Sequence, residues 1–401
     1  MKFLRNQLDK AKHNFEKGGK WEKFYYAFEA FDTFLFAPNT TNGIKGAQVR
    51  DAVDLKRLMM TVIIAMVPCL LFGIYNVGHQ HFLAIGQEAA FGDKFMIGLI
   101  QVVPIIIVSY ATGLGVEFIF SIIRRHPVNE GFLVSGMLIP LVMPPDVPLW
   151  QVAVATIFAV VIGKEAFGGT GMNVLNVALT ARAFLYFAYP VNIAGEVWTY
   201  LPDKAQAVAG YSGATPLAIA AQAGTTEGAN AVDALNSFGA GWADQIFSFS
   251  NLFFGLIPGS IGETSTLMCL IGGLILILTG TGSWKIITSV FAGAFGMGLL
   301  INAIGGNAYV ELPAQYHLVM GGLAFGAVFM ATDPVTATQT ETGKWIYGLM
   351  IGILTVLIRV FNPAYPEGIM LAILLMNVFA PLIDYFVVSA NKKRRLKRAT
   401  V

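Results

Sequence analysis

Long apolar segments limit how this chain folds more than any other feature. A helix needs roughly twenty apolar residues to cross about 30 Å of hydrocarbon. With 55% hydrophobic and 12% charged residues, the chain has too little polar surface to cover a soluble globule. The sequence therefore predicts an all-α integral membrane protein with ten transmembrane helices, at about 58–77, 95–123, 131–144, 148–168, 174–190, 262–280, 284–304, 314–331, 345–361 and 368–390.

The two halves of the chain resemble each other. Five apolar runs precede a more polar interval at 191–261 and five follow it. Gly-bearing stretches at 131–136 and 321–326 are each followed by a break that contains Pro and Asp. A half with five spans begins and ends on opposite sides of the membrane, so the second half is inserted upside down relative to the first. Broken spans in matching places of such inverted repeats usually bracket a binding site. We expect two inverted five-helix repeats with short broken helices; small residues at helix contacts are the alternative explanation of the pattern.

The basic residues indicate the orientation of the spans. If the chain starts in the cytoplasm, most of the 26 Lys and Arg residues fall on the cytoplasmic side of the membrane. Only Lys94, Lys204 and Arg359 fall on the outer side. Both termini are therefore expected in the cytoplasm and the central interval outside. Basic clusters that flank apolar spans are membrane anchors, so no nucleic-acid partner is expected. Cys69 and Cys269 lack a paired spacing, and no metal site is predicted.

These observations divide the chain into five parts. We expect a cytoplasmic amphipathic arm (1–57), a first repeat (58–190), an outward-facing loop (191–261), a second repeat (262–390) and a basic cytoplasmic tail (391–401). The arm carries an apolar stripe, but the segment as a whole is too polar to cross the membrane. This combination predicts an amphipathic helix that lies in the membrane interface. A soluble helix docked on a partner is the alternative. The stripe consists of Trp21, Phe24, Phe28, Phe31 and Leu35.

A short motif stands in the outward loop. Tyr211 is followed by Ser212, Gly213, Ala214, Thr215 and Pro216. By itself this motif is more typical of a turn leading into the Ala-rich stretch at 217–223. Further motifs accompany it at 129–132, 143–151, 164–171 and 182–190. Together they resemble the B subunit of the sodium-translocating NADH:quinone oxidoreductases, over nearly the whole chain; Ala209 departs from related attachment sites, which often carry an acid ahead of the motif.

The resemblance implies a function. In that family the Thr hydroxyl, here Thr215, is joined to FMN by a phosphoester bond, and Ser212, Gly213 and Ala214 complete the motif. A second flavin, riboflavin, is held without a covalent bond, and ubiquinone is reduced while Na+ is exported across the bacterial inner membrane. The expected partners are the other members of a six-subunit complex, including an NADH-oxidising flavin and iron–sulfur subunit and an outward-facing FMN subunit. No Gly-x-Gly-x-x-Gly nicotinamide fingerprint is present, so NADH oxidation is assigned to a partner and no catalytic residue is predicted here.

Flavin-binding residues are predicted in two places. Arg182 is the one basic residue well inside a span, and it is suited to hold the FMN phosphate or a reduced flavin; an ion pair with Glu263 is the alternative. Thr170, Asn173 and Asn176 form a small, amide-rich entrance suited to riboflavin. Close helix packing with a capping Asn is the alternative there.

Quinone and sodium residues complete the predicted site. We expect the quinone to bind under the amphipathic helix at Phe28 and Phe31, against Glu130 and Gly131, where the short third span opens on the same face. Charges inside spans are costly and commonly functional. The candidates for a sodium pathway are therefore Glu117, Glu263, Asp333 and Asp384.

Two other functions remain open. The corresponding subunit of the Rnf ferredoxin:NAD+ oxidoreductase shares the attachment motif, although it typically starts close to its first span, whereas this chain has an arm of some fifty residues. A channel or transporter with inverted repeats and no redox role is the other.

Overall fold

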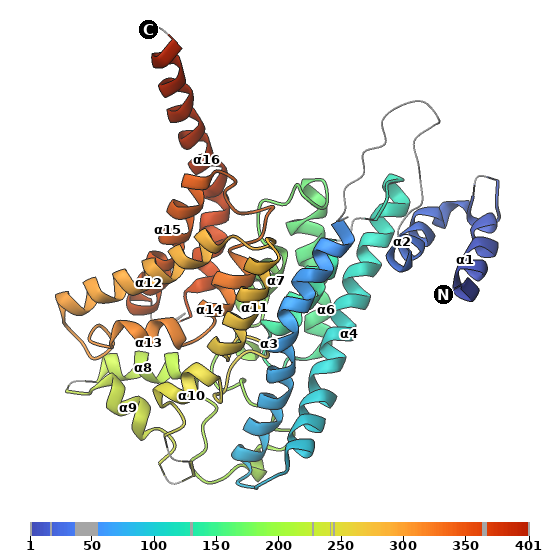
Figure 1. Ribbon diagram of the computed structural model, residues 1–401. Helices are drawn as coiled ribbons and strands as arrows, with labels where there is room; N and C mark the ends of the chain where they lie inside the picture. The colour runs from blue at the N-terminus through green and yellow to red at the C-terminus, as the bar shows by residue number, and fades with distance from the viewer. Residues whose placement is uncertain are drawn as a thin grey trace.

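The described part of the chain is helical. The computed structural model describes residues 2–16, 18–36, 55–128, 131–226, 228–240, 242–243, 245–362 and 367–399, and within these residues it has no β-strand. Six helices are long and apolar enough to cross a membrane. The predicted all-α membrane architecture is confirmed at this level (Figure 1).

The first half contains three long and two short helices. The long ones match predicted spans closely, whereas the short ones are interrupted before they reach the length of a bilayer crossing. The elements are α3 (Leu55–Ala84), α4 (Phe91–Arg124), α5 (Phe132–Leu141), α6 (Leu149–Gly163), the 3-10 turn η2 (Glu165–Phe167) and α7 (Val177–Ala188).

The central interval is folded into short helices. Its first elements are the 3-10 turns η3 (Pro190–Asn192) and η4 (Lys204–Gln206), followed by α8 (Pro216–Thr225), α9 (Ala231–Ser237) and α10 (Phe249–Phe254). They surround a second apolar core that includes Leu217, Leu235 and Phe247. The interval is therefore a structured cap and not an open loop.

The second half again combines long helices with a broken one. Its elements are α11 (Thr266–Leu278), α12 (Trp284–Ile304), α13 (Ala314–Val319), α14 (Leu323–Phe325), the π-helical turn η5 (Gly326–Met330), α15 (Glu341–Phe361) and α16 (Ile369–Ala399). The predicted span at 314–331 is thus three short pieces. Gly321 has a φ of +64°, a left-handed conformation that glycine adopts readily, and it separates α13 from α14.

Close backbone contact holds the long helices together. α3 packs on α4, α4 on α6, α12 on α15 and α3 on α11. At Gly98 of α4, an added Cβ would overlap the carbonyl oxygen of Ile74 on α3. Such small residues allow two helices to approach closely where lipid supplies no hydrophobic driving force.

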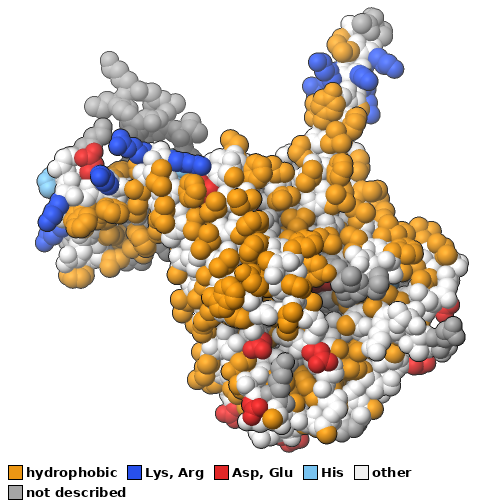
Figure 2. Space-filling model, turned by 180° about the vertical axis from the view of Figure 1, so that it is seen from behind, with side chains coloured by type: hydrophobic (Ala, Val, Ile, Leu, Met, Phe, Trp, Pro, Cys, Tyr) orange, Lys and Arg blue, Asp and Glu red, His pale blue; other side chains and the backbone are white. Residues whose placement is uncertain are grey.

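The projecting part of α16 lies at the opposite end of the molecule from α8, α9 and α10, and the N-terminal helices stand to one side of the bundle (Figure 1). Lys and Arg side chains gather on these terminal helices, whereas several Asp and Glu side chains are visible at the end away from α16 (Figure 2). The last helix, α16, projects beyond the helical bundle with its basic segment. The orientation of the chain in the membrane stays a prediction.

The N-terminal arm differs from the single amphipathic helix that the sequence predicts. It forms α1 (Lys2–Phe15), the 3-10 turn η1 (Glu22–Phe24) and α2 (Tyr25–Leu35). The α1 helix was not expected. Arg5 bonds Asp32 at 2.9 Å and ties α1 to α2, while α2 packs on α4. Trp21, Phe31 and Leu35 stay about half exposed, as expected of a stripe that faces lipid or a partner.

Arg359, which the sequence analysis counted as an outward-side charge, lies inside the protein. Its side chain is fully buried and donates to the carbonyl oxygens of His317 at 2.6 Å, Met320 at 2.9 Å and Glu367 at 3.0 Å. The end of the six-residue helix α13 leaves carbonyl groups without helical partners. Arg359 satisfies them inside the protein, so its charge carries no information about membrane sides.

We expect Gly98→Val to separate α3 from α4. The added side chain meets backbone that cannot move away, and overpacking of this kind costs about 1–3 kcal/mol or more. Gly115→Val on the same helix is the matched control, because no heavy atom lies within 4 Å of its added Cβ. Thermal unfolding of detergent-solubilised protein should show a lower Tm for Gly98→Val and little change for Gly115→Val. Equal Tm values would contradict the close contact.

Candidate functional site

Thr215 begins a helix. It is the N-cap of the 10-residue helix α8, with Pro216 in the first helical position, and its Oγ1 accepts a hydrogen bond from the amide of Ala218 at 3.3 Å. The start of a helix has unpaired N–H groups and a partial positive charge. An anion attached to Thr215 would therefore lie where a helix stabilises negative charge.

The rest of the motif is fixed by the segment at 196–199. Ser212 donates to Oε1 of Glu196 at 2.7 Å, and an added Cβ on Gly213 would approach the carbonyl oxygen of Glu196 to 2.9 Å. Tyr211 donates to Oγ1 of Thr199 at 2.7 Å. Burial raises the pKa of Tyr211 to about 12, so the phenol stays protonated and keeps donating at neutral pH. The motif thus has a single defined shape.

Thr215 opens into a cavity of about 110 Å³. The cavity lies between α7, α8 and the segments before α11 and after α13, and we call it the outer cavity. Its walls combine apolar side chains with glycines that let a ligand approach the backbone. The lining includes Tyr186, Trp198, Leu217, Gly259, Ser260, Glu263, Gly321, Gly322 and Glu367.

Arg182 supports the floor of the outer cavity. It is 2% exposed and donates to Oε2 of Glu263 at 2.7 Å, to Oε2 of Glu367 at 2.5 Å and to Oγ of Ser260 at 3.3 Å. These three partners line the cavity, whereas Arg182 is not among its lining residues in the described part of the chain. The predicted alternative, an ion pair with Glu263, is confirmed, and contact of Arg182 with FMN stays a prediction.

A second cavity, of about 240 Å³, lies at the other end of α11. We call it the inner cavity. It brings together residues that the sequence assigned to different ligands, namely Gly131, Thr170, Asn173, Asn176 and Asp333. Apolar side chains of α3 and α11 also line it, including Leu58, Met59, Val62 and Leu276.

The polar groups of the inner cavity differ in how they are bonded. Asn176 caps α7 by accepting from the amide of Leu179 at 3.2 Å, and it donates to Oδ2 of Asp333 at 3.3 Å. The capping alternative is therefore confirmed for Asn176. Oγ1 of Thr170 is buried and has no hydrogen-bond partner among the described residues. A buried hydroxyl of this kind is costly unless a ligand or water completes its bonding.

The four predicted sodium-pathway carboxylates have separate surroundings. Glu117 forms a buried ion pair with Lys164, and Glu263 pairs with Arg182. Asp333 accepts from the amide of Val335 at 3.0 Å as well as from Asn176. Glu263 lines the outer cavity and Asp333 the inner one. The structure thus does not gather these residues in one place, and their role in sodium transport stays a prediction.

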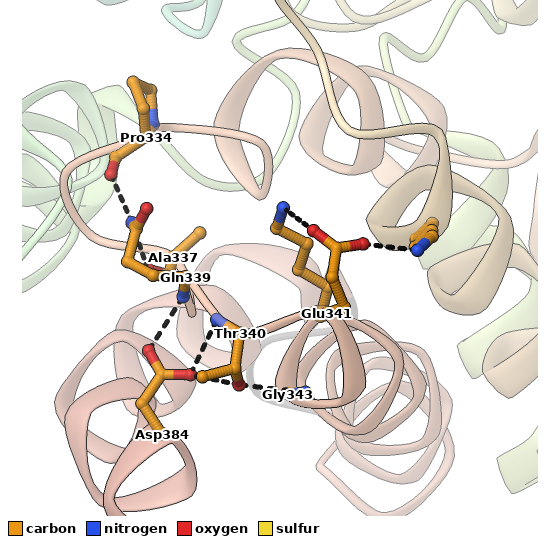
Figure 3. Close-up of polar contacts among 9 residues, drawn as sticks. Pro334, Ala337, Gln339, Thr340, Glu341, Gly343 and Asp384 are labelled. Carbon is orange, nitrogen blue, oxygen red and sulfur yellow. Dashed lines mark hydrogen bonds and ion pairs between the residues drawn. The ribbon is translucent and has the colours of Figure 1, made fainter. Parts of the chain in front are cut away.

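Asp384 joins two helices. It accepts from the amide of Gln339 at 2.7 Å, the amide of Thr340 at 3.0 Å and the hydroxyl of Thr340 at 2.6 Å (Figure 3). Thr340 is the N-cap of α15. The Asp384 carboxylate therefore stabilises the start of α15 from α16, close to the exposed ion pairs of Glu341 with Lys285 and Lys344.

The predicted quinone residues are not brought together. Phe28 stacks on Phe15 with ring centroids 4.7 Å apart, and Phe31 lies 5.9 Å from Phe118 of α4. Gly131 lines the inner cavity, and in the described part of the chain neither ring does. Glu130 lies outside the described residues. The reason is that α2 packs on the outer side of α4 (Figure 1).

Sequence reasoning missed two residues of these sites. Lys164 lines the inner cavity, although it was counted only as an anchor at the end of a span. Glu367 bonds Arg182 and lines the outer cavity, although it follows a Pro-containing turn. In both cases an ionisable residue directly at a span end was the available signal.

Fold and sites together define the class of this protein. It is a multi-helix membrane protein with buried ion pairs and, at each end of the short helix α11, a cavity that combines apolar walls with a few polar groups. The chain belongs to the NQR2, RnfD, RnfE family, whose profile matches residues 44–393. This confirms the family that the sequence motifs indicated.

Individual relatives are similar over their full length. The chain is 48% identical to the B subunit of the Na(+)-translocating NADH-quinone reductase of Ectopseudomonas mendocina (strain ymp), over 98% of this chain and 99% of the relative. It is 48% identical to the protein of the same name from Pseudomonas aeruginosa (strain UCBPP-PA14), with the same coverage. Identity to that of Chromohalobacter salexigens is 47%, over 98% of this chain and 96% of the relative.

We expect Arg182→Met to destabilise the protein strongly. The substitution leaves the Glu263 and Glu367 carboxylates without their cation, and breaking a buried pair on one side costs about 3–5 kcal/mol. The double variant Arg182→Met with Glu263→Gln should recover part of the loss, because it removes one of the two unpaired charges. Tm measurements in detergent would show this order.

Lys285→Met is the control for this comparison. Lys285 pairs with the exposed Glu341, and exposed pairs contribute little, so its Tm should stay near that of the unmodified protein. A Tm for Arg182→Met as high as that of Lys285→Met would show that the ion pairs of Arg182 do not hold the floor of the outer cavity.

Proposed function

We propose that this chain is the B subunit, a membrane component, of a Na+-translocating NADH:quinone reductase. In this function it carries electrons from a covalent FMN through riboflavin to ubiquinone and couples the transfer to Na+ export. The carrying observation is the 48% identity to a protein of that name over 98% of this chain and 99% of the relative. The relatives align over the N-terminal arm as well, which favours this complex over the Rnf counterpart.

The surroundings of Thr215 fit a covalent FMN. A phosphoester on Oγ1 would lie at the start of α8, where the partial charge of the helix favours a phosphate. The adjoining outer cavity has apolar and aromatic walls for a ring system, and Gly259, Gly321 and Gly322 permit close approach. Arg182 would act through Glu263 and Glu367, by holding these carboxylates in place.

The inner cavity fits a second, non-covalent flavin. Thr170 offers a buried hydroxyl without a partner among the described residues, and Asn173 offers an amide at the cavity wall. The bound flavins supply the one- and two-electron chemistry. The residues of the chain supply binding, orientation and charge.

We assign the quinone to the inner cavity and sodium to the buried carboxylates. The α3 side of the inner cavity is apolar and includes Leu58, Met59 and Val62, which suits a lipid-soluble quinone next to Gly131. Moving one charge against 100 mV costs about 2.3 kcal/mol. To bind at Glu117, Glu263, Asp333 or Asp384, sodium would have to replace the present bonding partners of that carboxylate. If the redox state of the flavins changes how strongly those partners are held, it controls how much of the site sodium occupies.

The proposed topology has ten spans in two inverted halves. Matching contacts support it: α4 packs on α6 in the first half, and α12 packs on α15 in the second. The short helix α5 corresponds to the broken segment from α13 to η5. With both termini cytoplasmic in a bacterial inner membrane, Thr215 faces outward, toward an FMN-carrying partner in a six-subunit complex, and NADH is oxidised by a flavin and iron–sulfur partner.

Thr215→Ala should abolish covalent flavin. The substitution removes the oxygen that forms the phosphoester, while Ser212→Ala removes a neighbouring hydroxyl and should keep at least part of the label. Flavin fluorescence of the protein band in a denaturing gel measures this directly. Full fluorescence in Thr215→Ala would overturn the attachment site, and a dark band in the unmodified protein would favour a transporter without a redox role.

Thr226 and Asn391 should be labelled from opposite sides of the membrane. Both side chains are exposed, the first at the end of α8 and the second on the projecting part of α16. Thr226→Cys should react with an impermeant thiol reagent added to cells whose outer membrane is permeabilised, and Asn391→Cys should react only after the inner membrane is opened. The native Cys69 and Cys269 are buried and should stay unlabelled. The reverse pattern would contradict the proposed orientation.

A further inference from the structure

A buried ion pair stands behind the inner cavity. Lys164 follows the last residue of α6, and its ammonium group pairs with the Glu117 carboxylate of α4. The two residues are 3% and 4% exposed. Lys164 lines the inner cavity, whereas Glu117 is not among the lining residues in the described part of the chain. Lys164 is therefore part of the cavity wall, and the carboxylate that pairs with it lies behind that wall.

The position of Lys164 favours a fixed positive charge. The carbonyl end of α6 carries partial negative charge, which stabilises a cation there. The carboxylate of Glu117 compensates the cost of burying the ammonium group. Asp333 is the other charged residue among the described lining of the cavity, and its carboxylate is held by Asn176 and the amide of Val335.

We infer that the Lys164–Glu117 pair raises the reduction potential of the flavin in the inner cavity. The inference rests on the proposed function, in which electrons arrive from the flavin on Thr215 and leave to quinone. Each added electron makes the bound ring more negative unless a proton accompanies it. A cation at the cavity wall stabilises that charge strongly, because the surroundings are apolar and water does not screen the interaction. Lys164 is a compact point charge, and Glu117 acts as a positioning residue that holds it.

The test is a redox titration of the assembled complex. Lys164→Met alone leaves Glu117 buried without its cation and can unfold the protein, so the primary variant is Lys164→Met combined with Glu117→Gln. This double variant keeps the net charge and removes the oriented pair. The midpoint potential of the non-covalent flavin should become more negative by at least about 59 mV. This shift corresponds to a tenfold change in the equilibrium constant of a one-electron reduction.

Three controls define the outcome. The potential of the flavin on Thr215 should stay unchanged in the same sample, because α11, 13 residues long and so about 20 Å, separates the two cavities. Arg124→Met removes a nearby cation that pairs with Glu165 and is not among the described residues lining the cavity; it should leave the inner flavin unchanged. Lys164→Arg should keep most of the original potential.

An unchanged potential of the inner flavin in the double variant would overturn the inference. So would an equal shift in Arg124→Met, because the effect would then be a general response to lost charge. If the unmodified complex holds no non-covalent flavin, the proposed function itself fails. These results are therefore distinguishable.

Discussion

Every polar group inside the apolar part of this protein needs a partner from the protein itself, because lipid supplies none. The breaks in the helices create this need. Where α13 ends, Arg359 bonds three carbonyl oxygens. Near the start of α11, Asn76 of α3 donates to the carbonyl oxygen of Ile257 at 2.9 Å. The interrupted helices are therefore held by side chains from distant parts of the sequence.

The same requirement governs the charges. Arg182 is shared between two glutamates, and Lys164 is held by Glu117. A buried charge without its partner costs several kcal/mol, so these groups fix the relative positions of α4, α6, α7 and the segments around α11. Packing of small residues, as at Gly98 against Ile74, then brings the long helices into contact. The ion pairs thus determine which helices lie next to each other, and the packing of small residues determines how closely these helices approach.

Sequence alone predicted the parts of this structure that depend on local composition. The long apolar runs correspond to α3, α4, α6, α12, α15 and α16. Partnerships over long separations were not predictable in the same way. Glu117 and Lys164 are 47 residues apart, and Arg182 and Glu367 are 185 apart, so no local pattern connects them. The packing of Phe28 and Phe31 was not predictable for the same reason: their periodicity shows an apolar stripe but not the helix that it packs on.

The two cavities differ in the charged side chains at their walls, and the difference bears on the electron path proposed above. Two carboxylates, Glu263 and Glu367, line the outer cavity, and their shared cation Arg182 lies behind them. The inner cavity has both Lys164 and Asp333 at its wall, and the carboxylate that pairs with Lys164 lies behind it. Added negative charge is therefore less favoured beside Thr215 than beside Lys164, so an electron on the path proposed here moves toward the more favourable site.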